Sequence, residues 1–224
     1  MIVFTPVPIC EHDDILGVDF NTKFAAEMHS YYVPFVTKNR DIQVAKETWE
    51  YAVADSIIDA KWCGAGHNVV DVTTPIIDID VKGISTNDME KYKLTTEASF
   101  LQNNKQKNDG FAELFEQKKY DLLKKMFVDP LATKIKGTNN LHLLGIIREK
   151  DKRKVYYCLL KIQSLEMSEK DFISKMTSEG KRSVSIPLID EKYGKTYIYI
   201  PKRRLELRLD CIGLAPFLTY SHTY

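Results

Sequence analysis

The sequence contains few cysteines, and none of them stands in a recognisable pairing pattern. Cys10, Cys63, Cys158 and Cys211 are widely separated, and no C-x-x-C pair occurs. This spacing argues against a zinc site and against a disulfide framework. The chain also lacks an apolar run near transmembrane length and a basic leader before an apolar segment. We therefore expect a cytoplasmic protein with reduced thiols and no membrane partner.

Several catalytic motifs are missing as well. There is no P-loop, no glycine-rich dinucleotide motif and no G-x-S-x-G elbow, which argues against the enzyme classes built on them. The five histidines are scattered, so neither a His-Asn-His nuclease nor a histidine-rich metal site gains support. An excess of one charge is absent too, because 32 basic and 31 acidic residues leave a net charge of +1. Any contact with nucleic acid must then come from local basic patches.

What the chain does have is the composition and length of an ordinary globular protein. Its 224 residues are 44% hydrophobic and 28% charged, and we expect one domain over residues 1–224. Apolar residues at helical spacing predict helices over 43–60, 111–127 and 168–178, with Ser168 as a cap. Runs rich in β-branched and apolar residues predict strands over 68–85, 141–162 and 196–200. Residues 1–40 give no clear pattern, because prolines interrupt their apolar patches.

The most informative segment runs from residue 67 to residue 85. It places a lysine two residues after an aspartate inside an alternating, β-branched run. Successive side chains of a strand point to opposite faces, so one face of this strand should be apolar and the other charged. The apolar face would carry Ile77, Ile79, Val81 and Gly83, and the charged face would carry Asp78, Asp80 and Lys82.

A further acid, Asp71, precedes this run. The intervening Thr73-Thr74-Pro75 is typical of a turn that joins two short strands. If the chain turns near residues 73 to 76, Asp71 lies opposite Asp78 and diagonal to Asp80, at a Cα separation of roughly 7–8 Å. Two carboxylates at that spacing can bind one hard cation between them.

The bare acid-x-Lys pattern occurs five times, but its context differs. Only the copy at Asp80 lies on a predicted strand; the others begin at Asp59, Glu116, Glu179 and Asp190. A purely structural interpretation is a surface strand on which Asp80 and Lys82 form a weak pair and the other acids are solvated. Three charges on one face of such a strand cost stability, which favours a functional interpretation.

At these residues the chain resembles the PD-(D/E)xK nuclease superfamily, in particular small type II restriction endonucleases. Asp71 matches the first acid of the motif, Asp80 the second acid and Lys82 the lysine, whereas Val70 stands where the motif has proline. The specific resemblance covers residues 64–85. It implies a restriction-endonuclease-like α/β fold, in which helices flank a central mixed β-sheet.

The resemblance also implies an activity and its ligands. It implies a homodimer that hydrolyses phosphodiester bonds of double-stranded DNA at a short palindromic sequence with Mg²⁺. Asp71, Asp80 and Lys82 would be catalytic, and the metal would be held by Asp71, Asp80 and the Val81 carbonyl. Lys82 would position or help deprotonate the attacking water. Glu50, from the helix before the strands, and Asp78 are additional candidates.

Residues that contact DNA are less well defined by the sequence. Five basic residues crowd segment 148–154, and more basic residues follow the predicted strand at 196–200. Such loops bind phosphates, but a solvated hairpin tip has the same composition. The candidate contacts are Lys152, Arg153, Lys202 and Arg203. The polar stretch 102–110 and His67 are either functional or plain loop residues.

Two other functions stay open. The first is a structure-selective nuclease, such as a junction resolvase or repair endonuclease, with the same chemistry. The second is a non-catalytic DNA-binding or interaction protein, in which Asp71, Asp80 and Lys82 are surface charges. Cleavage of an intact duplex into discrete fragments separates the first from a restriction enzyme, and titration with Mn²⁺ or Ca²⁺ tests the second.

Overall fold

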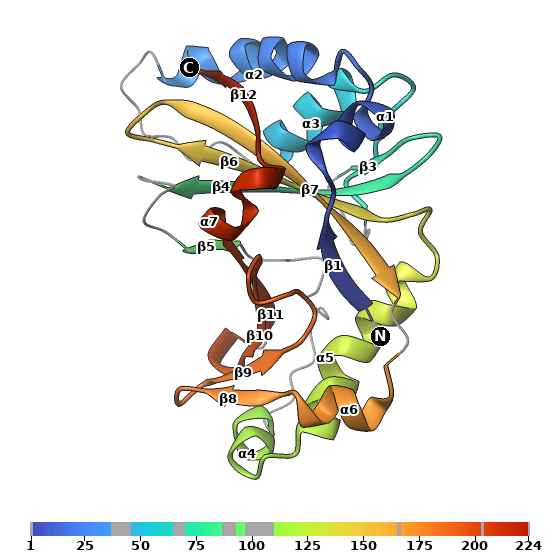
Figure 1. Ribbon diagram of the computed structural model, residues 1–224, viewed down its shortest axis with the longest axis vertical. Coiled ribbons are helices and arrows are strands. Elements are labelled where there is room, and N and C mark those ends of the chain that lie inside the picture. The colour runs from blue at the N-terminus through green and yellow to red at the C-terminus, as the bar shows by residue number, and fades with distance from the viewer. Residues whose placement is uncertain are drawn as a thin grey trace.

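The computed structural model describes residues 2–36, 46–64, 70–86, 93–96, 110–164, 167–202 and 204–223. Two β-sheets follow one another along the longest axis of the molecule (Figure 1). The central sheet consists of β1 (Ile2–Pro6), β2 (Lys61–Trp62), β3 (Val72–Thr73), β4 (Asp78–Thr86), β6 (His142–Glu149), β7 (Lys154–Ser164) and β12 (Thr219–Thr223). The second sheet consists of β5 (Lys93–Thr96), β8 (Thr177–Glu179), β9 (Ser183–Ile186), β10 (Gly194–Tyr199) and β11 (Arg204–Asp210).

Helices cover both ends of this arrangement. They are α1 (His12–Leu16), α2 (Phe20–Val36), α3 (Lys46–Ser56), α4 (Phe111–Glu116), α5 (Tyr120–Ile135), α6 (Glu169–Ser174) and α7 (Cys211–Leu214). Short 3₁₀ turns are η1 (Ile9–Glu11), η3 (Ile200–Lys202) and η4 (Ala215–Phe217). None of the helices in the described ranges has both the length and the apolar composition needed to cross a membrane. The four cysteines are free thiols.

The central sheet is mixed, as expected for an α/β protein. Its strand order is β2-β3-β4-β6-β7-β1, and β12 also pairs with β7. β4 and β6 run parallel, whereas the other pairs are antiparallel. A parallel pair needs a long crossover, and here the connection from β4 to β6 contains α5. The predicted class, an α/β fold with a central mixed sheet and helices, is therefore confirmed.

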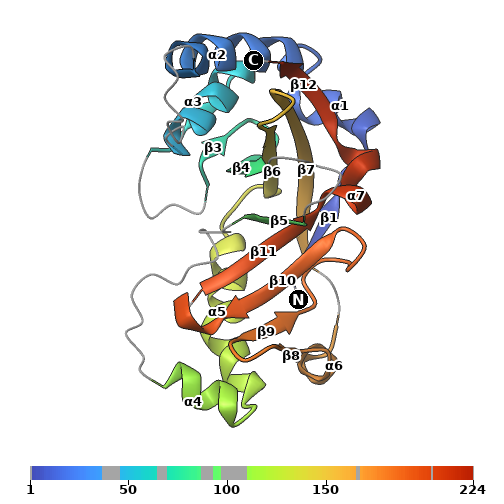
Figure 2. The same ribbon diagram turned by 90° about the vertical axis from the view of Figure 1, so that its left-hand side faces the viewer.

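Both faces of β4 are covered. Ile79 and Val81 belong to an apolar cluster with residues of α2 and α3, whereas Ile84 belongs to a second cluster with α5 and the second sheet. The turned view in Figure 2 shows these layers on opposite sides of the central sheet. The structural interpretation as a surface strand therefore disagrees with the structure, because the face that carries Asp80 and Lys82 lies in the interior.

A glycine fixes the position of α3 on the sheet. A Cβ atom at Gly83 would lie 2.6 Å from the indole nitrogen of Trp49, closer than van der Waals contact permits. The Trp49 ring therefore occupies the space that a side chain at residue 83 would fill. This contact places α3 directly against β4, one residue beyond Lys82.

Several predicted elements differ from the structure. The predicted helix 111–127 is two helices, because Lys118 adopts a left-handed φ of 54° between α4 and α5. The predicted helix 168–178 begins at the Ser168 cap but ends at Ser174. The predicted strand 196–200 lies in the second sheet and not in the central one. The predicted helix 43–60 is confirmed over α3 but ends at Ser56, and residues 43–45 lie outside the described ranges.

Candidate functional site

The hairpin of β3 and β4 sets the positions of the predicted acids. Its turn is closed by the Thr74 N–H, which donates to the Ile77 carbonyl at 2.9 Å. The Thr74 hydroxyl oxygen also accepts from the Ile77 N–H at 2.9 Å. In this register Thr73 pairs with Asp78 and Val72 with Ile79. One step further, Asp71 faces Asp80, so the expectation that Asp71 lies opposite Asp78 is wrong.

Backbone contacts hold Asp71 in place. Its N–H donates to the Ile79 carbonyl at 3.0 Å, and its own carbonyl accepts from the Cys63 N–H at 2.9 Å. Its carboxylate oxygen Oδ2 accepts a hydrogen bond from the Val81 N–H at 2.8 Å. The first acid of the motif is thus fixed to the strand that carries the second.

Lys82 joins the two acids. Its Nζ lies 2.7 Å from Asp80 Oδ1 and 2.6 Å from Asp80 Oδ2. It lies 3.5 Å from Asp71 Oδ2 and donates to the Val81 carbonyl at 3.2 Å. We call Asp71, Asp80 and Lys82 the acid–lysine cluster. The structure brings together all three residues that the sequence motif selects.

The acid–lysine cluster is buried. The exposed fractions are 7% for Asp71, 1% for Asp80 and 4% for Lys82. Burial raises the pKa of the Asp80 carboxyl to about 8; the Lys82 ammonium opposes this rise and the charge of Asp71 adds to it. Two carboxylates and one ammonium in the interior carry a net negative charge when both acids are ionised, and such a site attracts a further cation.

The two additional acids have separate partners. Asp78 Oδ1 accepts from the Thr73 hydroxyl at 2.7 Å, and Asp78 Oδ2 accepts from the Asn139 N–H at 2.7 Å. These contacts tie the start of β4 to the turn before β6. Glu50, only 2% exposed on α3, accepts a hydrogen bond from the Trp62 indole at 3.0 Å. Both interactions give these acids a structural task; their role as metal ligands stays a prediction.

Sequence reasoning did not single out Thr73, Asn139 or Trp62. Thr73 lies two residues after Asp71, and this spacing on a strand is a signal that could have been used. Asn139 and Trp62 are distant in sequence from the acids that they bind, and no local pattern identifies them.

The predicted DNA-contacting residues lie in two different places. Lys152 is half exposed and pairs with the buried Glu149 at 3.0 Å, and Arg153 occupies the same β6–β7 turn with a left-handed φ of 52°. Lys202 ends η3, next to α4. Arg203, His67 and residues 102–109 lie outside the described ranges.

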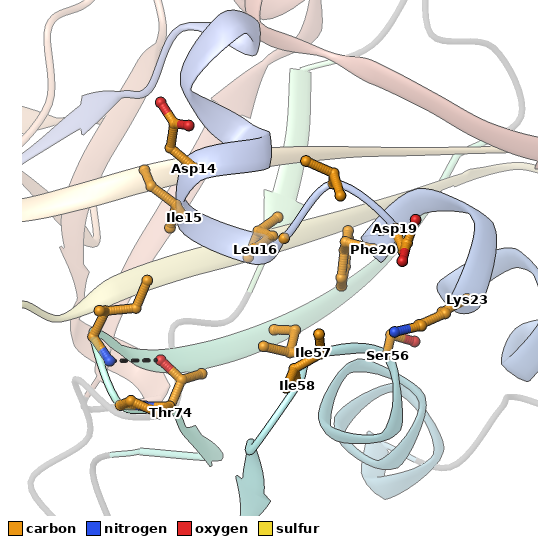
Figure 3. Close-up of a pocket in the computed structure, with 14 residues that line it drawn as sticks. Asp14, Ile15, Leu16, Asp19, Phe20, Lys23, Ser56, Ile57, Ile58 and Thr74 are labelled. Atoms are coloured by element: carbon orange, nitrogen blue, oxygen red, sulfur yellow. Dashed lines mark hydrogen bonds between the residues drawn. The ribbon is translucent and has the colours of Figure 1, made fainter.

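A separate apolar cavity lies at the tip of the hairpin (Figure 3). Its volume is about 230 Å³, and residues of α1, of the end of α3 and of the turn at Thr74 line it. None of its lining residues belongs to the acid–lysine cluster. Across the described ranges, no three residues of the types His, Cys, Asp and Glu are grouped to hold a metal ion. A metal at the cluster would therefore rely on two carboxylates and backbone or water oxygens.

No family model, curated protein or solved structure matches this chain. The acid–lysine cluster is therefore the feature of this chain from which a function can be inferred.

Proposed function

We propose that the protein is a Mg²⁺-dependent endonuclease that hydrolyses phosphodiester bonds of double-stranded DNA, as type II restriction endonucleases do. The observation that carries the proposal is the acid–lysine cluster itself. Buried charges cost stability unless they are well paired, and such clusters occur preferentially at functional sites. The alternative in which Asp71, Asp80 and Lys82 are surface charges disagrees with their burial.

The order of elements around the cluster supports the same proposal. A helix that carries a buried glutamate, α3, precedes the hairpin, and a crossover through α5 leads to β6 beside β4. A mixed sheet with helices agrees with the restriction-endonuclease-like fold that the sequence resemblance implies. The surrounding architecture is therefore compatible with the resemblance, which itself covers residues 64–85.

The donor atoms of the cluster suit Mg²⁺. Carboxylate and carbonyl oxygens are the ligands that this ion prefers, and it keeps several of its waters. Asp71, Asp80 and the Val81 carbonyl already surround a positive charge, the Lys82 ammonium, which stands where a cation can be held. The residues present therefore fit the ion. Bound there, Mg²⁺ would supply Lewis-acid assistance to phosphate hydrolysis.

The side chains of the cluster then have distinct tasks. Asp71 and Asp80 offer oxygens whose positions the hairpin fixes. Lys82 donates hydrogen bonds, so it can orient the attacking water and offset negative charge that develops on the phosphate. The water oxygen bonds to phosphorus, one ester P–O bond breaks, and the proton that the water loses is balanced by the proton that the leaving oxygen takes up. The products are a phosphate monoester end and a hydroxyl end.

The burial of the cluster has a consequence for substrate access. A phosphate cannot reach side chains that are 1–7% exposed. The proposal therefore includes a change of conformation when DNA binds, which uncovers this face of β4.

Digestion of phage DNA by the purified protein with Mg²⁺, followed by sequencing of the ends, tests the proposed function. Discrete ends that share a short palindrome support a restriction endonuclease. Cleavage confined to branched or damaged DNA would instead indicate the structure-selective nuclease. Complete inactivity on all these substrates, with a folded protein and with Mn²⁺ as well, contradicts the nuclease proposal.

Cleavage of both strands at a palindrome requires two sites related by a twofold axis, so we propose a C₂ homodimer on DNA. Analytical ultracentrifugation of the complex tests this. A monomer bound to cognate DNA contradicts it.

A further inference from the structure

We propose that the Lys82 ammonium occupies the cation site of the acid–lysine cluster, and that a divalent metal binds only by displacing it. This inference rests on the proposed metal site and concerns how that site is regulated. Lys82 would be both a residue of the reaction and the competitor that sets the affinity for the metal.

Oxygen atoms of three residues surround Lys82 Nζ. Both carboxylate oxygens of Asp80 lie within 2.7 Å of it, the Val81 carbonyl lies at 3.2 Å and Asp71 Oδ2 at 3.5 Å. These are the same oxygens that the motif assigns to the metal. The ammonium is therefore centred on the donor set and does not lie beside it.

The two cations cannot share this position. Mg²⁺ approaches its oxygen ligands to about 2.0–2.1 Å and Ca²⁺ to about 2.3–2.6 Å. An ammonium that contacts both oxygens of Asp80 occupies the space and the lone pairs that a bound ion needs. A divalent ion would also repel the ammonium strongly at such short range in a poorly solvated interior. Metal binding and the observed position of Lys82 are therefore mutually exclusive.

The structure allows this exchange without moving Asp71. Asp71 is held by the Val81 N–H, which is a backbone contact that does not involve Lys82. The lysine side chain has a flexible four-carbon stem, so its ammonium can move while its Cα stays in the strand. Without metal the ammonium contacts both buried carboxyl groups, and with metal it is released toward the substrate. Lys82 thus becomes available for the reaction only in the metal-loaded protein.

Calorimetric titration of the metal-free protein with Ca²⁺ tests this inference without measuring activity. Lys82→Met should bind Ca²⁺ at least about tenfold more tightly than the wild type, since close charge pairs contribute an order of magnitude or more to affinity. Without metal, Lys82→Met should melt at a lower temperature than the wild type. Adding Ca²⁺ should raise its melting temperature by more than it raises that of the wild type. Lys124→Met is the matched control, because Lys124 forms a similar 2.6 Å pair with Asp129 on α5. Its affinity should equal that of the wild type.

The outcomes separate the two proposals. If the wild type binds Ca²⁺ and Lys82→Met binds it equally or more weakly, the displacement of Lys82 is overturned. The metal site then stays intact. No binding of Ca²⁺ or Mn²⁺ by either protein overturns the metal site, and the displacement with it.

A measurement on the wild type avoids dependence on the folding of the variant. The side-chain ¹⁵N resonance of Lys82 should shift when Ca²⁺ saturates the protein, while that of Lys124 should not. An unchanged Lys82 resonance at saturation overturns the inference.

Discussion

The carboxylate of Asp71 accepts a hydrogen bond from the backbone N–H of Val81 at 2.8 Å, across the hairpin. This contact orients the first acid toward the second with backbone atoms alone. A site whose ligands are held by the surrounding structure does not need the metal to assemble it. We therefore expect Asp71 to keep its position when the cation at the cluster changes.

The first prediction concerns the charges of the two acids. Asp71→Asn and Asp80→Asn should each abolish DNA cleavage and weaken Ca²⁺ binding severely, because each removes a negatively charged ligand. The fold should survive, since an asparagine side chain at the first position keeps a carbonyl oxygen that can accept from the Val81 N–H. Phage DNA digestion, calorimetry and thermal melting measure the three effects, with Asp129→Asn as a control. Full cleavage by either variant would end the assignment of these acids.

The second prediction separates catalysis from binding at Lys82. Lys82→Ala should lower the cleavage rate by roughly 10²-fold or more, the range expected for lost acid–base or electrostatic assistance. Its affinity for DNA should change little, because the proposed phosphate contacts are Lys152, Arg153, Lys202 and Arg203 and not Lys82. Single-turnover rates and filter binding at saturating Mg²⁺ compare the two quantities. Equal losses of rate and affinity would show that Lys82 only anchors a phosphate.

The third prediction concerns pH. Burial raises the pKa of Asp80 from 3.8 to about 8, so the folded protein binds this proton more tightly than the unfolded chain. The corresponding contribution to stability is full below the unfolded pKa and is lost as pH rises through about 8. The melting temperature of the metal-free wild type should therefore fall more between about pH 6 and pH 9 than that of Asp80→Asn.

The same shift predicts that Ca²⁺ binding releases a proton below about pH 8, since metal ligands must be deprotonated. Calorimetry in buffers of different ionisation enthalpy measures this release. A raised pKa at Asp80 would be contradicted by two results together. The melting temperatures of the wild type and of Asp80→Asn would change equally between about pH 6 and pH 9, and Ca²⁺ binding would release no proton.

The fourth prediction assigns a structural role to Asp78. Asp78→Ala removes the acceptor of hydrogen bonds from Thr73 and Asn139, and it should lower the free energy of unfolding by about 1–3 kcal/mol. Its affinity for Ca²⁺ should stay close to that of the wild type, unlike that of Asp80→Asn. Chemical denaturation and calorimetry give the two values. A large loss of Ca²⁺ affinity with unchanged stability would make Asp78 a ligand instead.

The fifth prediction concerns the basic segments. Joint neutralisation of Lys152, Arg153, Lys202 and Arg203 should weaken binding to all DNA sequences alike and flatten its dependence on salt. Lys152 should contribute less to DNA binding than Arg153, because Glu149 already compensates the charge of Lys152. Binding measured over a series of salt concentrations tests this, and an unchanged slope would show that these residues do not contact phosphates.

Local sequence patterns predicted the elements that carry the cluster. The period of two placed Asp80 and Lys82 on one face of β4, and the strands β6 and β7 followed from their apolar runs. The register of the hairpin was wrong because the Thr74 hydroxyl closes the turn later than the Thr-Thr-Pro sequence indicates. Turn chemistry of this kind depends on side-chain contacts that a propensity does not describe.

Other features depend on packing between distant segments. The helix α2 contains Pro34 and lies in a stretch that has no clear pattern, yet its residues Phe20 and Phe24 are fully buried against the central sheet. The face of β4 that carries Asp80 and Lys82 also carries Ile84, which packs in a cluster with α5 and the second sheet. Neither the sequence near Asp80 nor its alternation contains information about that second layer.

Because Trp49 packs against Gly83, substitutions at these two positions, 34 residues apart, depend on each other. A larger residue at position 83 requires a smaller one at position 49, so substitutions at the two positions should be tolerated only as pairs. Glu50 follows Trp49 directly, and Gly83 follows Lys82 directly. Redesign of either position would therefore displace α3, with Glu50, relative to the strand that carries Lys82.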